Sequence, residues 1–378
     1  MIQNWFSPEN LYFQLFIGYM VSVAVLMLYY FGLFSRLAFY RMSESPLHNE
    51  PVSVVICARN EYQNLQDNLP LFLSQDYPQF EIVVVNDASQ DDTYFLLKVL
   101  SDQHENLKVV NIEKEINFFK GKKFPLSIGI KSASHDILLL TDADCIPASD
   151  QWIREMTSAY QNKDTSVVLA YGAYKTVTGF LNKIIRYETV VSAMMYLSMA
   201  RAGIPYMGVG RNLSYRKSLF YSNKGFISHY GIASGDDDLF INKVANSKNT
   251  AVMIAPQSFT YSEPKKSFEE WFRQKRRHLT TSGYYKFKHQ LLLGAYVFFQ
   301  YTFYGLFTLL LVLKYPWQPL VIFFGIKFFI YLFIFKKSML KLKERNLLLF
   351  SPLLEIVFLF IYPTISLANL FGKENKWR

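Results

Sequence analysis

Four long apolar segments constrain this chain more than any other feature of its sequence. Residues 11–34 and residues 291–313 contain no charged side chain. Two weaker segments follow: residues 320–335 include Lys327, and residues 347–371 include Glu355. Because a membrane-spanning helix needs about 20 mostly apolar residues, the first two segments predict spanning helices. The last segment is the weakest candidate, because an ionisable group is costly in hydrocarbon.

These segments divide the chain into three parts. We expect an N-terminal transmembrane helix in residues 1–35, a domain outside the bilayer in residues 36–290, and two or three transmembrane helices in residues 291–378. Basic side chains follow the first segment and lie between the last two: Arg36, Arg41, Lys336, Lys337, Lys341, Lys343 and Arg345. The positive-inside rule then places the middle domain in the cytoplasm, and we expect a bacterial inner membrane. The tail Lys373, Lys376 and Arg378 would fall outside, against that rule.

Composition excludes several other classes of protein. Hydrophobic residues make up 51% of the chain, far more than a disordered chain contains. Two cysteines, Cys57 and Cys145, are too few for a disulfide framework. A net charge of +10 could suit nucleic acid, but much of it lies at the predicted membrane edges. We therefore expect a lipid bilayer and no nucleic acid as a partner, while the oligomeric state stays open.

The middle segment alternates between strand and helix patterns. Continuous apolar runs predict strands at residues 52–57, 80–85, 107–112 and 136–140. Helical patterns lie between them, at residues 61–75 (with Asn60 as its cap), 89–102 and 122–134. This alternation predicts an α/β fold with a mostly parallel sheet covered by helices. Ligands of such sheets bind beyond the carboxyl ends of the strands, where polar residues stand at 58–61, 86–87 and 142–144.

Two acidic clusters are candidates for chemistry. Asp142 and Asp144 flank one residue at the end of an apolar strand, and such hard oxygen ligands suit Mg²⁺ or Mn²⁺. The alternative is an ordinary turn, in which Asp is common. Asp236, Asp237 and Asp238 are consecutive, so their mutual repulsion would raise at least one pKa if they are partly buried, as a general base requires. The alternative is a helix N-terminus, and both can hold together.

Two further segments each allow two interpretations. Residues 271–278 combine Trp, Gln, His and four cations, which would suit a clamp for a diphosphate and an acceptor. On charge alone they would be a juxtamembrane stretch attracted to anionic lipid. Residues 179–201 are apolar and rich in Met, which indicates a helix at the membrane surface or a buried core helix.

In their order along the chain, these features resemble the family 2 glycosyltransferases, which are inverting nucleotide-sugar enzymes of the GT-A fold. The resemblance covers about residues 50–280, and the membrane-embedded branch of the family includes cellulose and hyaluronan synthases. It rests on the segments 51–61 (PVSVVICARNE), 84–93 (VVNDASQDDT), 121–129 (GKKFPLSIG), 141–144 (TDAD), 234–239 (SGDDDL) and 274–278 (QKRRH).

The resemblance implies a role for each matching residue. It places Ala58, Asn60, Glu61, Asp87 and Lys122 at the nucleotide. It makes Asp142 and Asp144 the metal site, and Asp237 the base, with Asp236 as a second catalytic candidate. The diphosphate and acceptor clamp would be Gln274, Arg276 and Arg277, and the acceptor site would include Arg211, Asn212 and His278. The expected donor is a nucleotide sugar, with UDP favoured, and the acceptor is a glycan or a lipid-linked molecule.

Departures from the family pattern leave alternatives open. His278 stands where the membrane branch has Trp, which argues against a long polysaccharide product. Pro125 and Ser127 replace the usual Ala and Asn of the G-K segment. The main hypothesis is an inverting transferase that acts on a hydroxyl acceptor. The alternatives are a polyprenyl-phosphate sugar transferase, which needs no strong base, and a non-catalytic membrane protein with an inert domain.

Overall fold

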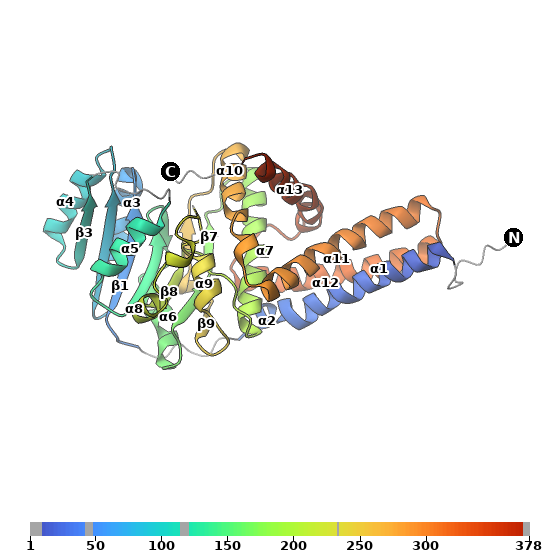
Figure 1. Cartoon of the computed structure of the whole chain (residues 1–378), viewed down its shortest axis with the longest axis horizontal. Coiled ribbons are helices and arrows are strands. Elements are labelled where there is room, and N and C mark those ends of the chain that lie inside the picture. The colour runs from blue at the N-terminus through green and yellow to red at the C-terminus, as the bar shows by residue number, and fades with distance from the viewer. Residues whose placement is uncertain (1–9, 42–47, 114–120, 233, 373–378) are drawn as a thin grey trace. The chain divides into compact units, whose positions relative to one another are not determined.

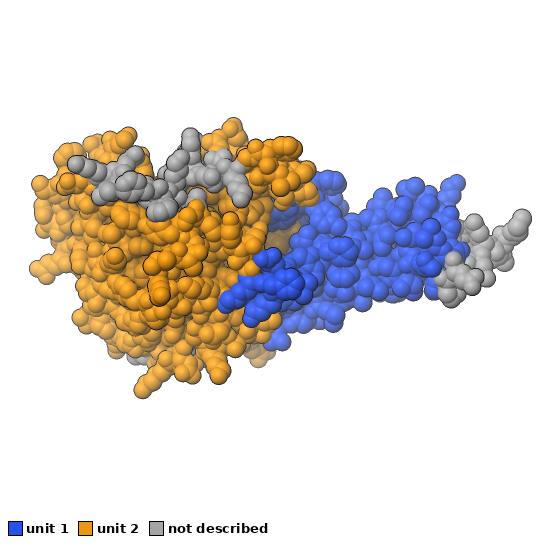
Figure 2. All heavy atoms as spheres, in the orientation of Figure 1, with its two compact units in different colours: residues 1–40, 286–362 blue, residues 41–285, 363–378 orange. Residues whose placement is uncertain are grey.

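A computed structural model describes residues 10–41, 48–113, 121–232 and 234–372. The basic tail at residues 373–378, with its predicted side of the membrane, lies outside this range. The chain divides into two compact units (Figure 2). The first unit contains residues 1–40 and 286–362, and the second contains residues 41–285 and 363–378.

The first unit consists of long apolar helices. They are α1 (Leu11–Leu28), the π-helical η1 (Tyr29–Phe34), α2 (Ser35–Ala38), α11 (Phe287–Val312), α12 (Trp317–Lys341) and most of α13 (Ser351–Phe371). Four stretches in the described chain are long and apolar enough to cross a membrane: Leu11–Ala38, Phe287–Val312, Trp317–Lys341 and Ser351–Phe371. By length and composition, the weakest segment of the sequence is thus a fourth candidate span.

Lys327 of α12 and Glu355 of α13 form an ion pair. The Lys327 ammonium lies 2.7 Å from both carboxylate oxygens of Glu355, and both side chains are buried. Tyr304 donates a hydrogen bond of 2.7 Å to the same carboxylate, and Gln300 donates one of 3.0 Å. Each charge has a partner on a neighbouring helix. The cost of placing Glu355 in hydrocarbon, which argued against the fourth segment as a span, is therefore largely offset.

The second unit is built on a seven-stranded sheet with the order β3-β2-β1-β4-β8-β6-β9 (Figure 1). Its strands are β1 (Val52–Ala58), β2 (Phe80–Asp87), β3 (Leu107–Ile112), β4 (Ile137–Asp142), β6 (Val167–Ala170), β8 (Leu213–Arg216) and β9 (Thr250–Met253). The first four strands are parallel, whereas β8 runs antiparallel to both neighbours. A second sheet contains β5 (Cys145–Pro147), β10 (Thr260–Ser262) and β7 (Gly172–Tyr174). The expected mostly parallel α/β fold is confirmed.

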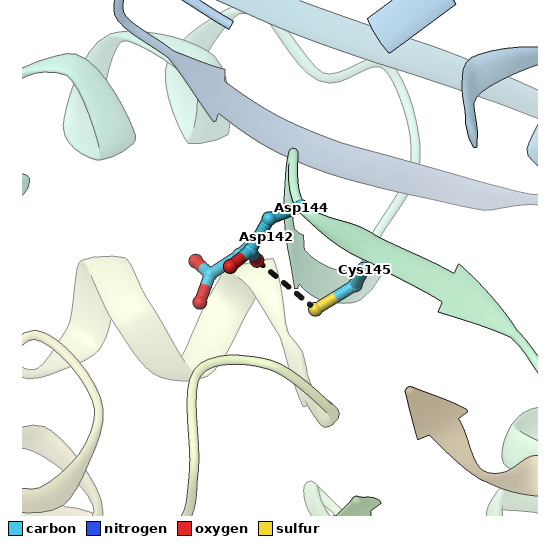
Figure 3. A group of neighbouring side chains, drawn as sticks. All are labelled: Asp142, Asp144 and Cys145. Atoms are coloured by element: carbon cyan, nitrogen blue, oxygen red, sulfur yellow. Dashed lines mark hydrogen bonds between the residues drawn. The ribbon is translucent and has the colours of Figure 1, made fainter. Parts of the chain in front are cut away.

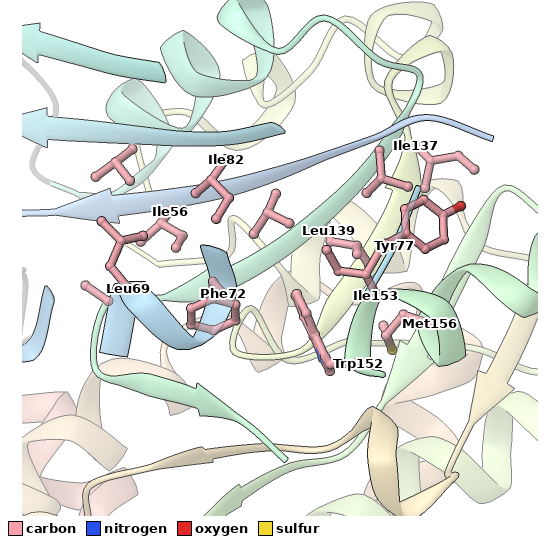
Figure 4. Close-up of a cluster of buried hydrophobic side chains, with 14 of the residues drawn as sticks. Ile56, Leu69, Phe72, Tyr77, Ile82, Ile137, Leu139, Trp152, Ile153 and Met156 are labelled. Carbon is pink, nitrogen blue, oxygen red and sulfur yellow. The ribbon is translucent and has the colours of Figure 1, made fainter. Parts of the chain in front are cut away.

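Helices cover both faces of the large sheet. The helices of this unit include α3 (Tyr62–Leu73), α4 (Thr93–Gln103), α5 (Lys123–Ser132), α6 (Trp152–Ser158), α7 (Phe180–Arg201), α8 (Lys217–Ser222), α9 (Asp238–Val244) and α10 (Phe268–Leu279). On one face, Ile56, Ile82 and Leu139 pack against Phe72 of α3 and Trp152 of α6 (Figure 4). Most side chains of α7 are buried, which supports the core interpretation of that Met-rich segment.

On the other face, α5 packs very close to the strands. A Cβ at Gly129 would lie 2.7 Å from Val55 Cγ1 and 2.9 Å from Val85 Cγ2, closer than real contacts allow. Glycine at this position therefore lets the helix backbone approach the sheet. This approach sets the position of the first turn of α5, which carries Lys122 and Lys123.

Candidate active site

The polar ends of three parallel strands meet at one edge of the sheet. Ala58 lies opposite Asn86 in the register, and Cys57 lies opposite Asp142. Asp87 is buried, and its carboxylate lies 3.9 Å from the Arg59 guanidinium. The convergence expected from the strand pattern is therefore present.

The loop after β1 is tied to the loop after β2. Asn60 is not the cap of the next helix, because Glu61 occupies that position and Asn60 has a φ of 56°. Instead, its N–H donates to Ser89 Oγ at 2.9 Å, and its Oδ1 accepts from Gln90 N at 2.7 Å. The surface here is hollowed, and the hollow is lined by Asn60, Glu61, Tyr62, Gln63, Asn64, Asp91 and Asp92. Burial, and to a lesser extent the charges of Asp144 and Asp142, raise the pKa of Glu61.

Asp142 and Asp144 form a compact acidic pair with Cys145 between the two sheets (Figure 3). One ligand atom from each of the three lies within 4.8 Å of the others. Cys145 Sγ lies 3.0 Å from Ser262 Oγ, and burial raises the pKa of its thiol, which stays neutral. The two carboxylates are therefore the hard ligands here, and they fit a divalent cation such as Mg²⁺ or Mn²⁺.

Lys122 is the cation closest to this pair. Its ammonium forms an ion pair with Asp142. Burial alone would lower the pKa of Lys122, but Asp142, Cys57 and Asp236 together raise it. Burial acts to raise the pKa of Asp142, yet the Lys122 charge lowers it overall, whereas burial and the Asp142 charge raise the pKa of Asp144. The two carboxylates thus differ in their protonation behaviour, and Lys122 interacts with both acidic clusters.

The two residues predicted for the acceptor site have different surroundings. The Arg211 guanidinium lies 4.2 Å from the centre of the Tyr174 ring, and its charge lowers the pKa of Asp142. Asn212 is fully buried, and its amide accepts from Trp152 Nε1 at 3.1 Å. It also donates to the carbonyls of Tyr171 at 2.9 Å and Ser258 at 2.7 Å. Every polar atom of the Asn212 side chain is engaged inside the fold, which leaves none to contact an acceptor.

Asp237 lies at the start of α9 and is its N-cap. Its Oδ2 accepts from Gly210 N and its Oδ1 from Asp238 N, each at 2.7 Å. Burial, together with the charges of Asp236 and Asp238, raises the pKa of Asp237 to about 8. One carboxylate of the triplet therefore has the raised pKa expected from its position, and the same residue also caps the helix.

Asp238 has a contact that the sequence did not reveal. Its Oδ2 accepts hydrogen bonds from Thr281 Oγ1 and, at 2.7 Å, from Tyr285 OH. Both donors follow α10, so this carboxylate joins the start of α9 to the segment beyond α10. No local pattern predicts such a contact, because its partners are more than 40 residues away in sequence.

Helix α10 carries the residues predicted for the clamp, and they have different surroundings. Gln274 Oε1 and Arg277 Nε are buried without a hydrogen-bond partner among the described residues, and the Arg277 charge lowers the pKa of Asp142. His278 follows on the same helix and is exposed to solvent. Arg276 binds elsewhere: its Nε donates to Asn369 Oδ1 at 3.1 Å, and its Nη2 donates to the carbonyls of Ala368 and Gly372. Arg276 was expected at the diphosphate, but in the structure its guanidinium binds the end of α13.

Three comparisons relate this geometry to known proteins. Residues 53–225 match the family model described as glycosyl transferase family 2. The poly-beta-1,6-N-acetyl-D-glucosamine synthase of Staphylococcus epidermidis is 28% identical over 173 residues, which cover 44% of this chain and 40% of that protein. The probable glycosyltransferase YdaM of Bacillus subtilis is 25% identical over 274 residues, which cover 68% of this chain and 63% of YdaM. The chain thus spans less than two thirds of the length of these relatives.

A solved structure shares the fold. The mannosyltransferase PcManGT from Pyrobaculum calidifontis, solved with GDP-Man and Mn²⁺, superposes with a TM-score of 0.56 at 17% sequence identity. The match covers 86% of this chain and 98% of that protein. Residues 53–225 are thus similar to glycosyl transferase family 2, the fold is of the GT-A type, and the chain also contains helices long and apolar enough to cross a membrane.

Proposed function

We propose that this protein is a membrane-bound inverting glycosyltransferase that moves a sugar from a nucleotide diphosphate to a hydroxyl group of a glycan or lipid-linked acceptor. The observation that carries the proposal is the pairing of two carboxylate sites in one unit. Asp142 and Asp144 can hold a cation, Asp237 has the raised pKa of a base, and Lys122 interacts electrostatically with both clusters.

The donor would bind at the strand ends. The hollow beside Asn60 and Glu61 and the buried Asp87 are suited to hold the nucleoside. The side chains of Lys122 and Arg277 supply positive charge near Asp142, where the diphosphate would lie. A divalent cation held by Asp142 and Asp144 would stabilise the negative charge that develops on the leaving diphosphate. A UDP-sugar remains the favoured donor, although the mannosyltransferase that shares the fold was solved with GDP-Man.

Asp237 would act on the acceptor. Its carboxylate takes the proton of the acceptor hydroxyl as the oxygen attacks the anomeric carbon. The bond between that carbon and the diphosphate oxygen breaks in the same step, and the electron pair leaves with the nucleoside diphosphate. This single displacement inverts the anomeric configuration. NMR of the product checks the stereochemistry, and retention of the donor's configuration would contradict the scheme.

The raised pKa of Asp237 favours a hydroxyl acceptor over a lipid phosphate. A phosphate is already ionised at neutral pH and needs no base, so Asp237→Asn would then cost little activity. The carboxylates, Lys122 and Asp87 occur together in one unit, which an inert domain has no reason to maintain. The relatives that polymerise N-acetylglucosamine suggest a hexosamine among the first donors to test.

The membrane helices suggest where the reaction takes place. Four candidate spans and the basic residues at 36, 41, 336, 337, 341, 343 and 345 support a bacterial inner membrane protein whose catalytic domain faces the cytoplasm. The topology can be tested with a reporter that is active only in the cytoplasm. Fused after residue 290, such a reporter should be active.

Nucleotide binding tests the proposal before the acceptor is known. The detergent-purified protein is titrated with UDP and with GDP, each with and without Mn²⁺. We expect metal-dependent binding of one nucleotide, lost in Asp144→Ala and kept in Asp164→Ala, which changes an exposed residue. If neither nucleotide bound in the presence of metal, the transferase proposal would be wrong.

A further inference from the structure

Lys123 is a buried lysine whose role the reaction scheme leaves unexplained. It is the first residue of α5 and directly follows Lys122. Only 3% of the surface of Lys123 is exposed to solvent. Its ammonium donates to three backbone carbonyls, those of His229 at 3.0 Å, Ile232 and Ser234 at 2.5 Å. A lysine ammonium has three donors, so all of its hydrogen-bonding capacity is used on one short segment.

That segment leads directly into the acidic triplet. Gly235 follows Ser234 with a φ of 99°, and a Cβ there would lie 2.5 Å from Leu239 Cδ1. The backbone therefore enters α9 through one tightly packed residue, and Asp237 comes two residues later. Fixing the carbonyl of Ser234 consequently restricts where the Asp237 carboxylate can lie.

Lys123 also supplies charge of the opposite sign. The carboxylates of Asp236, Asp238 and Asp237 all act on its ammonium. Around Asp237 itself, the ionisable groups are Asp236 and Asp238 on its own segment, Lys123 from α5 and Tyr215 from β8. Lys123 thus adds a positive charge beside the acidic triplet, in addition to Lys122, on which the Asp236 charge also acts.

We infer that Lys123 is a positioning residue for the base: it holds the segment before Asp237 and balances the charge of the triplet, while its neighbour Lys122 contacts Asp142. This inference rests on the proposed role of Asp237. Two consecutive residues of one helix start would then connect the donor carboxylates with the base, and the loss of Lys123 would affect the chemical step more than nucleotide binding.

The test compares Lys123→Met with Lys217→Met. Lys217 is a matched control because its ammonium donates to the carbonyls of Ala133 and Lys131, at the other end of α5. Gly210 N–H donates to Asp237 Oδ2, so hydrogen exchange of the Gly210 amide reports directly on the position of the base. We expect faster exchange of this amide in Lys123→Met and no change in Lys217→Met.

Kinetics give the second readout. In Lys123→Met, kcat should fall about 100-fold, as for a misplaced catalytic group, with nucleotide affinity within about twofold of the wild type. The acidic limb of the pH–rate profile should move to higher pH, because a positive charge that favours ionised Asp237 is removed. If Lys123→Met does not fold, Lys123→Gln is used in the same measurements, because its amide keeps hydrogen-bond donors at this position without the charge.

The outcomes separate the two proposals. Unchanged exchange at Gly210, or equal losses in the Lys217 control, would overturn the role of Lys123. The exchange measurement needs no donor or acceptor, so it decides the inference even if the wild-type protein transferred no sugar. Failure of the wild type to bind a nucleotide with metal would overturn the proposed function alone.

Discussion

The rate of sugar transfer should depend on pH with a midpoint at the pKa of Asp237, and removing the Asp237 carboxylate should abolish this dependence. With a pKa of about 8, roughly one tenth of Asp237 is ionised at pH 7 and about nine tenths at pH 9. If Asp237 is the base, kcat/KM of the wild-type protein should rise about tenfold between these two pH values. Asp237→Asn should lose about 100-fold to 10,000-fold in rate, the usual contribution of a general base, and its remaining activity should not follow this curve.

The assay is release of the nucleoside diphosphate from the donor selected by titration, measured from about pH 6 to about pH 10. Asp236→Asn should shift the midpoint to lower pH, because the Asp236 charge is one of the causes that raise the pKa of Asp237. Asp102→Asn, which changes an exposed residue on α4, is the control for general charge effects. A midpoint near the ordinary pKa of aspartate, or the same midpoint in Asp237→Asn, would refute the assignment.

The same group links folding to pH. Because the pKa of Asp237 is about 8 in the folded chain and 3.8 ordinarily, the folded state binds more protons between these values. The free energy of unfolding should therefore fall as the pH rises from about 4 through about 8. In Asp237→Asn this contribution to the pH dependence should disappear, which thermal unfolding of the purified protein measures without any substrate.

Three further changes have expected outcomes. Asn212→Ala should destabilise the fold by about 2–5 kcal/mol, because it leaves the Trp152 N–H and the Ser258 carbonyl without these partners and removes one of the two donors to the Tyr171 carbonyl. The melting temperature should fall, and the nucleotide affinity of the folded protein should be unchanged. Lys327→Met should cost about 3–5 kcal/mol because Glu355 remains buried without its counter-charge, and adding Glu355→Leu should restore most of the melting temperature. Arg276→Ala should lower the transfer rate more than Asn369→Ala, because only Arg276 also binds the carbonyls of Ala368 and Gly372, and a double-mutant cycle should show non-additive effects.

The sheet could be predicted well because its signal is local. Strands buried on both faces are continuous apolar runs, and the observed β1, β2, β3 and β4 lie within two residues of the predicted ends. The meeting of their polar ends then follows from parallel pairing alone. The predicted helix cap at Asn60 is wrong for a different reason: an Asn before a helix usually caps it, but here the left-handed backbone directs its side chain to the neighbouring loop.

The contacts that hold the acidic triplet could not be predicted. Lys123 binds carbonyls more than 100 residues later, and a hydrogen bond to a carbonyl places no requirement on the side chain there. Asp238 similarly depends on Thr281 and Tyr285, whose identities are common in any loop. Such contacts leave no spacing pattern, so only the folded chain shows that they converge.

The different position of Arg276 could have been predicted from the helical spacing of residues 274–278, although its charge suggested the same role as that of Arg277. Successive residues of a helix are about 100° apart, so Gln274, Arg277 and His278 lie on one side of α10, whereas Arg276 lies about 200° from Gln274. A helix cannot present all four to one ligand. Grouping them by charge therefore assigned to the diphosphate an arginine that instead binds the end of α13. The consequence is mechanistic: the helix that carries Gln274 and Arg277 is fastened by Arg276 on its opposite side, so the geometry of the predicted clamp depends on the C-terminal end of the last candidate span.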